Sequence, residues 1–129
     1  MYFTNHDLVA YVYCILVNAE FSERPRDTVV VQGYSTYLNC SISGMPADMR
    51  WFHYALGARP DQNTEVYTNG ELVPTYAGRL RVEKTTNASA NLIFSQAKFS
   101  DAGTYACIEG RSNRNASAQL LVLGKLTIT

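Results

Sequence analysis

The stretch that decides the fold is DAGTYAC, from Asp101 to Cys107. Cys107 stands 67 residues after Cys40 and 56 residues after Trp51. Tyr105 lies two positions before the second cysteine. Two cysteines that enclose a tryptophan, with a tyrosine just before the second one, are typical of two β-sheets stacked around a shared core. The stretch therefore predicts an antiparallel sandwich of two sheets.

The rest of the chain fits this prediction. From Glu20 on, short apolar alternations are separated by turn signals every eight to twelve residues, which indicates an all-β sandwich. Asn69-Gly70 predicts a type I′ hairpin, 110–115 a polar loop, and Pro25 a bend in the first strand at a sheet edge. We expect strands at 28–32, 36–42, 49–54, 64–68, 71–73, 79–84, 90–94 and 116–123.

Alternation within these strands assigns a core face. In 36–42, Cys40 falls on the apolar face with Leu38 and Ile42. In 49–54, the alternation turns Trp51 inward and Phe52 outward. The other inward residues that we expect are Met49, His53, Leu80, Val82, Leu92, Phe94, Ala118, Leu120 and Val122.

The N-terminal segment resembles a secretory leader. Leu8 to Val17 is an apolar run of ten residues, followed by small residues up to Ala19. The run is too short to cross a bilayer, which needs about 20 residues, and its length suits a signal peptide over 1–19. The preceding MYFTNHD has no Lys or Arg, so an N-terminal strand or short buried helix is the alternative. Removal of the leader would take Cys14 with it and leave two cysteines, a number suited to an oxidising compartment.

Composition bounds the class of protein. The chain has 129 residues, of which 47% are hydrophobic and 17% charged, with a formal net charge of +0. This is enough for one domain with a real core, which we place at 20–123. We expect 124–129 to be a linker or the start of a following domain. A chain without net charge has no basic field for nucleic acid, and no segment is expected to insert into a membrane.

The motifs together resemble a family. Cys40, Trp51, Leu92-x-Phe94-x-x-Ala97 and Asp101-x-Gly103-x-Tyr105-x-Cys107 are similar to an immunoglobulin superfamily domain of variable or mixed variable and intermediate type, across 21–123. The resemblance implies a disulfide between Cys40 and Cys107 and two additional edge strands from TEVYTNGELV. It also implies that Arg79 pairs with Asp101.

The resemblance also narrows the kind of receptor. The opening FSERPRDTVVVQGYSTYLNC, from Phe21 to Cys40, is similar to the first domain of nephrin-like adhesion receptors. No Phe-Gly-x-Gly motif follows the short loop at 110–115, which argues against an antibody or T-cell-receptor chain. An innate immune-type receptor or an adhesion module is the better expectation.

The sequence offers no catalytic constellation. Of two histidines, His6 lies in the leader and His53 stands alone, so we expect no metal site, no cofactor and no enzyme activity. His53 on the inward face is expected to be structural, with a pH-sensing role as the alternative. The Arg79 and Asp101 pair is likewise expected to be structural.

Binding is the more informative prediction. Alternation turns six residues of neighbouring strands outward, and large exposed apolar faces usually mark interaction sites. These residues are Phe52, Tyr54, Ala106, Ile108, Gln119 and Leu121, which Tyr67 joins if the register allows. One alternative is that a neighbouring domain or loop covers this face. Another is the loop end, made of Ser43 to Asp48, Asn69-Gly70 and Arg111 to Asn115, where Arg111 and Arg114 could anchor an acidic partner.

Three Asn-x-Ser triplets are candidate glycan acceptors in a secreted chain. Asn87 is expected in a turn, Asn115 beside the polar loop, and Asn39 is the weakest because Cys40 follows it.

The sequence therefore predicts an extracellular recognition module. We expect the distal domain of a cell-surface adhesion or immune-type receptor, secreted or as part of an ectodomain. Its partner is expected to be another immunoglobulin-type domain, including a second copy of itself as a homodimer. The alternatives are a soluble humoral factor that recognises microbial or glycan targets through its loops, and a structural spacer of a matrix protein.

Overall fold

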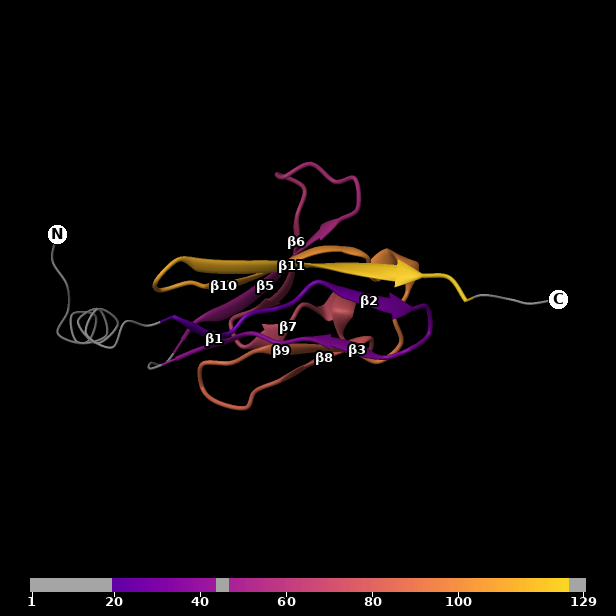
Figure 1. Ribbon diagram of the computed structural model, residues 1–129. Helices are drawn as coiled ribbons and strands as arrows, with labels where there is room; N and C mark the ends of the chain where they lie inside the picture. The colour runs from indigo at the N-terminus through magenta and orange to yellow at the C-terminus, as the bar shows by residue number, and fades with distance from the viewer. Residues whose placement is uncertain (1–19, 44–46, 126–129) are drawn as a thin grey trace, which may run out of the picture.

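The computed structural model describes residues 20–43 and 47–125, which form two stacked layers of β-strands (Figure 1). The leader predicted over 1–19 lies outside the described residues, as do 126–129 of the predicted linker. β1 begins at one end of the sandwich and β11 finishes at the other.

The first layer is a six-stranded sheet in the order β2-β11-β10-β5-β6-β7. Its strands are β2 (Thr28–Val31), β11 (Arg114–Leu123), β10 (Gly103–Glu109), β5 (Met49–Ala55), β6 (Thr64–Thr68) and β7 (Glu71–Leu72). All neighbours are antiparallel except β2, which runs parallel to β11. β6 and β7 form the hairpin expected from Asn69-Gly70, with φ of 53° and 80° at these two residues. Positive φ at both turn residues is the geometry of a type I′ turn.

The second layer is a three-stranded sheet in the order β3-β9-β8, beside a two-stranded pair of β1 and β4. Its strands are β1 (Phe21–Glu23), β3 (Thr36–Leu38), β4 (Ser41–Ile42), β8 (Leu80–Glu83) and β9 (Asn91–Phe94). The only helical segments among the described residues are two 3-10 turns, η1 (Pro74–Tyr76) and η2 (Phe99–Asp101).

The chain changes layers between β1 and β2. β1 pairs with β4 in the second layer, whereas β2 pairs with β11 in the first. Pro25 is buried within the crossing segment, Arg24 to Asp27. Proline has no N–H for a ladder, so a strand readily leaves its sheet there. The bend expected at Pro25 is therefore present, and it transfers the strand to the other sheet.

The two layers are joined by the disulfide between Cys40 and Cys107. Trp51 is fully buried and its Nε1 donates a hydrogen bond to the carbonyl of Ala90, 2.7 Å away. Of the inward residues, Val82 is partly buried and packs against the core, and the others are buried. The all-β two-sheet sandwich predicted from the sequence is confirmed.

The strand expected over 36–42 is divided into β3 and β4. The carbonyl of Ala90 accepts the Trp51 indole, and the Asn91 side chain instead accepts the backbone N–H of Cys40 at 3.0 Å. A side chain therefore replaces one rung of the ladder, and the pairing pattern is interrupted at Asn39 and Cys40.

The polar loop expected over 110–115 is shorter than predicted. β11 begins at Arg114, and Asn115 lies opposite Ile108 in the ladder. Asn113 supplies a positive φ of 57°, which lets the chain reverse within a few residues. Arg114 and Asn115 consequently belong to the strand and not to the loop.

Candidate functional site

The predicted docking residues lie on the outward face of the six-stranded sheet. β5, β10 and β11 are adjacent strands, and their register aligns outward residues in rows. These rows are Arg50–Ile108–Asn115, Phe52–Ala106–Ser117 and Tyr54–Thr104–Gln119. The fold thus brings together residues that are more than 60 positions apart in the sequence.

The residues of these rows differ in exposure. Phe52, Tyr54 and Ile108 are partly buried, Gln119 is exposed, and Leu121 is 46% exposed. Side chains that stand opposite one another on a sheet face cover part of each other's surface. The face therefore presents ring edges and aliphatic tips to solvent, and not whole side chains.

The placement of Tyr67 on this face was wrong. Its side chain is 4% exposed and belongs to the hydrophobic core. The register shifts between Trp51 and Phe52, so that Tyr67 lies opposite Trp51 while Phe52 lies opposite Glu65. A bulge of this kind changes which residues of β6 point inward. Ala106 does lie in an outward row, but at 4% exposure its small side chain offers little surface.

Four exposed apolar residues lie together on β2 and β11, and of these the sequence indicated only Leu121. Val29 is 62% exposed beside Leu121, and Val31 is 36% exposed beside Leu123, itself 45% exposed. We call these four residues the edge patch. Alternation in Thr28–Val31 could place Val29 and Val31 on one face, but the parallel pairing with β11 is a long-range contact that no local pattern reveals.

The loop end of the sheet is organised around a buried carboxylate. Glu109 is fully buried; its Oε2 accepts the backbone N–H of Asp48, and its Oε1 accepts the N–H of Ser112 at 2.7 Å and its hydroxyl at 3.0 Å. Arg50 pairs with Asp48 at 2.7 Å, which raises the pKa of the Arg50 guanidinium. Glu109 was not singled out from the sequence, because a glutamate in a strand that alternates gives no sign of its partners.

The candidate anchors at the loop end are dispersed. Arg111 is exposed in the turn after β10, whereas Arg114 is partly buried in β11. Asn69 and Gly70 are exposed on the β6–β7 hairpin. This hairpin forms one edge of the six-stranded sheet, and β2 forms the other. Of the predicted segment 43–48, positions 44–46 lie outside the described residues.

The opposite end of β10 holds the residues expected to be structural. Asp101 is 2% exposed. Its Oδ1 accepts a hydrogen bond from the Arg79 guanidinium, and its Oδ2 accepts one from the backbone N–H of Lys98 at 2.8 Å. The hydroxyl of Tyr105 donates to the carbonyl of Asp101 at 2.6 Å, as in a tyrosine corner. These contacts fix the chain where it enters β10.

His53 is buried against the same corner. Its ring stacks on Tyr105 with centroids 4.3 Å apart, and its Nε2 is 3.0 Å from the carbonyl of Ala102. Burial lowers the pKa of His53, since desolvation disfavours the charged imidazolium, although the Ala102 carbonyl opposes this. Burial also raises the pKa of the Tyr105 phenol. Burial therefore favours the neutral form of both side chains.

The candidate glycan acceptors lie in three different places. Asn87 is exposed in the turn between β8 and β9, and Asn115 is exposed on β11 beside Ile108. Asn39 is partly buried and lines a groove.

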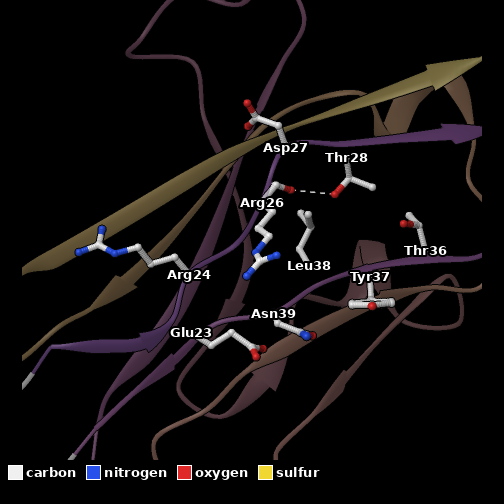
Figure 2. A pocket seen from close by; sticks show the side chains of 9 residues that line it. All are labelled: Glu23, Arg24, Arg26, Asp27, Thr28, Thr36, Tyr37, Leu38 and Asn39. Carbon is white, nitrogen blue, oxygen red and sulfur yellow. Dashed lines mark hydrogen bonds between the residues drawn. The ribbon is translucent and has the colours of Figure 1, made fainter.

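The groove is a polar hollow of about 510 Å³ between the β1–β2 crossing and β3 (Figure 2). Leu38, 1% exposed, is the most buried of its lining residues, and the Arg26 side chain extends among them (Figure 2). Its lining residues are Glu23, Arg24, Arg26, Asp27, Thr28, Thr36, Tyr37, Leu38 and Asn39. No pattern in the sequence indicates this hollow, which the change of layers creates.

Within 20–43 and 47–125, no group of three or more His, Cys, Asp or Glu side chains is placed to hold a metal ion. The same residues contain no helix with the length and apolar character needed to cross a membrane.

Comparisons with known proteins agree with the geometry. The family model of the immunoglobulin V-set domain matches residues 23–123. Mouse Neogenin is 30% identical over 105 residues, which cover 81% of this chain and 6% of Neogenin. Chicken Protein sidekick-2 is 30% identical over 122 residues, 92% of this chain and 5% of that protein. The chain thus spans only a small fraction of the length of these relatives.

A solved titin structure has the same fold. Its TM-score is 0.59 at 19% identity, over 86% of this chain and 53% of the titin chain. The match of the V-set model to most of the chain, together with the disulfide and the strand order, identifies this chain as a member of the immunoglobulin V-set family and an immunoglobulin-type recognition module.

Proposed function

We propose that this domain is an extracellular recognition module, the distal domain of a cell-surface adhesion or immune-type receptor. It docks the outward face of its six-stranded sheet onto another immunoglobulin-type domain, and a second copy of this chain is the first candidate. The disulfide supports an extracellular location, because such bonds persist in oxidising compartments. The leader predicted over 1–19 is consistent with export.

The observation that carries the proposal is the edge patch. Val29, Val31, Leu121 and Leu123 form two adjacent pairs on one face of neighbouring strands. Exposed apolar side chains that lie together, and not singly, are characteristic of interaction surfaces. Phe52 and Tyr54 lie on the same sheet at β5 and supply the aromatic groups that often dominate interface energetics.

The composition of the face suits a partner of the same class. Its exposed residues are mainly aliphatic, aromatic or amide, so two copies can meet without opposing large charges of one sign. A stable interface buries about 800 Å² on each partner, which requires most of the face and not the edge patch alone. Asn115 lies beside Ile108, so a glycan there would restrict docking to the half of the face nearer β2.

Sedimentation equilibrium and a cell-surface binding screen test the proposal. Val29→Asp combined with Leu121→Asp should abolish self-association or partner binding, since each buries a charge in an apolar contact. Phe52→Asp combined with Tyr54→Asp should have the same effect if the whole face is used. The matched control is Leu56→Asp, because Leu56 is 69% exposed outside the face, in the turn after β5.

Binding that survives both double variants would exclude the sheet face. Binding lost instead on Arg111→Glu would support recognition through the loop end. A domain that binds no partner in either assay would act as a spacer.

A further inference from the structure

The groove beside β3 contains an unpaired strand edge. β3 is an end strand of the second layer, with β9 as its neighbour, and β2 is an end strand of the first layer. β1 pairs with β4, but the chain then leaves at Pro25 for the other layer. β3 and β4 thus share one outer edge, of which β1 pairs with the part along β4 and leaves the part along β3 unpaired.

Hydrogen bonds on either side of β4 show which backbone groups face this edge. The N–H of Ile42 donates to Ala88, and the carbonyl of Cys40 accepts from Ala90, so even-numbered residues here face β9. The N–H of Ser43 donates to Glu20, so odd-numbered residues face β1. Successive backbone groups point to opposite sides of a strand.

The same parity extends into β3 without a shift. Leu38 lies opposite Leu92, and the register continues to the bridge between Ser41 and Ser89. The N–H and carbonyl groups of Tyr37 and Asn39 therefore face the groove. Among the described residues, the backbone of Asn39 has no hydrogen-bond partner.

The charged residues of the groove are not equally engaged. Asp27 accepts the backbone N–H of Gln119 at 2.9 Å, which ties it to β11. Arg24 stacks over Phe21, with its guanidinium 5.1 Å from the ring centroid. Arg26 forms no ion pair with any residue of the described ranges, and its guanidinium lies within the groove (Figure 2).

We propose that this groove binds an extended acidic peptide segment of another protein, which adds to the edge of β3 as a further strand. The backbone of Tyr37 and Asn39 would pair with the peptide backbone, and Arg26 would pair with one of its acidic side chains. Strand addition of this kind takes its affinity from main-chain hydrogen bonds and its specificity from alternate side chains. The site lies on the flank of the sandwich and does not depend on the docking face proposed above.

A peptide fits these groups better than a saccharide does. The available donors and acceptors are backbone groups repeated every second residue, which is the repeat of a β-strand. An unpaired edge also gains directly from such pairing. Glu23 in the lining would oppose a polyanion such as a sulfated glycan, whereas a single carboxylate can meet Arg26 alone.

Titration followed by ¹⁵N NMR tests the proposal on the folded domain. The probe is the capped peptide EVTVEV, which should shift the amides of Tyr37 and Asn39 and slow their exchange with solvent. The capped peptide KVTVKV should bind at least about tenfold more weakly, because it reverses the charge that faces Arg26. Two further copies of EVTVEV carry N-methyl groups on alternate residues of either parity, and the copy that blocks the pairing edge should not bind.

Two variants separate charge from position. Arg26→Glu should weaken EVTVEV binding by about tenfold or more, and Arg111→Glu, at an exposed arginine of the turn after β10, should leave it unchanged. The paired aspartate substitutions at Val29 and Leu121 should also leave it unchanged, so failure of this site and failure of the sheet face give different results.

Three results would overturn the proposal. The first is an absence of shifts at Tyr37 and Asn39 with millimolar EVTVEV. The second is equal binding by both N-methylated copies, which would show that the backbone does not pair. The third is perturbation of the groove by a heparin oligosaccharide with no response to the peptide.

Discussion

The two ends of β10 each combine a glycine with a buried carboxylate, but the two carboxylates are satisfied differently. Asp101, just before β10, accepts a guanidinium from Arg79 and a backbone N–H from Lys98. Glu109, the last residue of β10, accepts the backbone N–H groups of Asp48 and Ser112 and has no ion-pair partner within the described ranges. Asp101 is bound by a side chain that is distant in the sequence, whereas Glu109 is bound by backbone groups of two loops.

The difference indicates what each end does. The contacts of Asp101, together with the Tyr105 hydroxyl on its carbonyl, join η2, β10 and the turn before β8. That end fixes the sandwich itself. The contacts of Glu109 attach the turn after β10 and the segment before β5. That end fixes the shape of the loops that a partner would meet.

The largest effect is expected from Gly103→Ala at the Asp101 end. A Cβ at this position would lie 2.2 Å from the carbonyl oxygen of Tyr54, and the φ of 138° is unfavourable for other residues. Because backbone cannot move aside, we expect a loss of about 4 kcal/mol in the free energy of unfolding, or failure to fold. Urea denaturation followed by tryptophan fluorescence measures this.

Gly110→Ala is the matched control at the Glu109 end. Its Cβ would lie 2.5 Å from the Asp48 carboxylate oxygen, which belongs to a side chain that can rotate. We expect a loss of about 1 kcal/mol. Equal losses for the two glycine variants would contradict the distinction between the two ends.

The second prediction concerns Asp101→Ala. It should lower the free energy of unfolding by about 3 kcal/mol, because Arg79 keeps a partly buried guanidinium without its partner. Arg79→Met in the Asp101→Ala background should recover part of this loss, since it removes the stranded charge. A double-mutant cycle measures the coupling between the two residues. Additive losses would show that the pair is not coupled.

The third prediction concerns Glu109→Gln, which retains the size of the side chain. The amide group would turn an N–H donor toward the N–H of Asp48 or Ser112, so we expect a loss of about 2 kcal/mol. Amide exchange at Ser112 should accelerate, while that of Tyr105 in the strand centre should change only through the lower global stability. Arg50→Met should couple to Glu109→Gln more weakly than in the Arg79 and Asp101 cycle, because Arg50 pairs with Asp48 and not with Glu109 itself. Strong coupling would show that Glu109 also depends on a cation.

The predictability of the two ends differs for a physical reason. Asp101, Tyr105 and Cys107 stand at fixed spacings along one strand, so a local pattern places them. The partners of Glu109 are backbone groups of loops, and any residue type supplies a backbone N–H. Nothing in the sequence therefore marks Glu109.

The docking face shows the same limit. Alternation correctly turned Phe52 and Ile108 outward, because the period of a strand is local. It failed at Tyr67, where a bulge shifts the register by contacts between strands. The edge patch and the groove both arise from the change of layers at Pro25, of which the sequence indicated only the bend and the outward position of Leu121.

The smallest effect is expected for His53, whose titration makes the free energy of unfolding depend on pH. Burial lowers its pKa in the folded chain below the ordinary value of about 6.5, so the folded state disfavours the proton. As the pH falls below that value, the unfolded chain binds a proton that the folded chain rejects. Stability is therefore complete above about pH 6.5 and declines toward pH 5, by at most about 1.4 kcal/mol per pH unit.

His53→Gln should remove this slope while its amide still donates to the Ala102 carbonyl. Urea denaturation of the parent and the variant at pH values between 5 and 8 measures the difference in slope. Titratable groups that both proteins share contribute equally and cancel in this difference. An identical slope would show that folding does not change the proton affinity of His53, and a steeper decline in the variant would show that the corner favours the charged imidazolium. In the latter case the corner would be held by two cations, Arg79 and His53, around Asp101. The contrast with Glu109, which has no ion-pair partner within the described ranges, would then be larger than the neutral histidine implies.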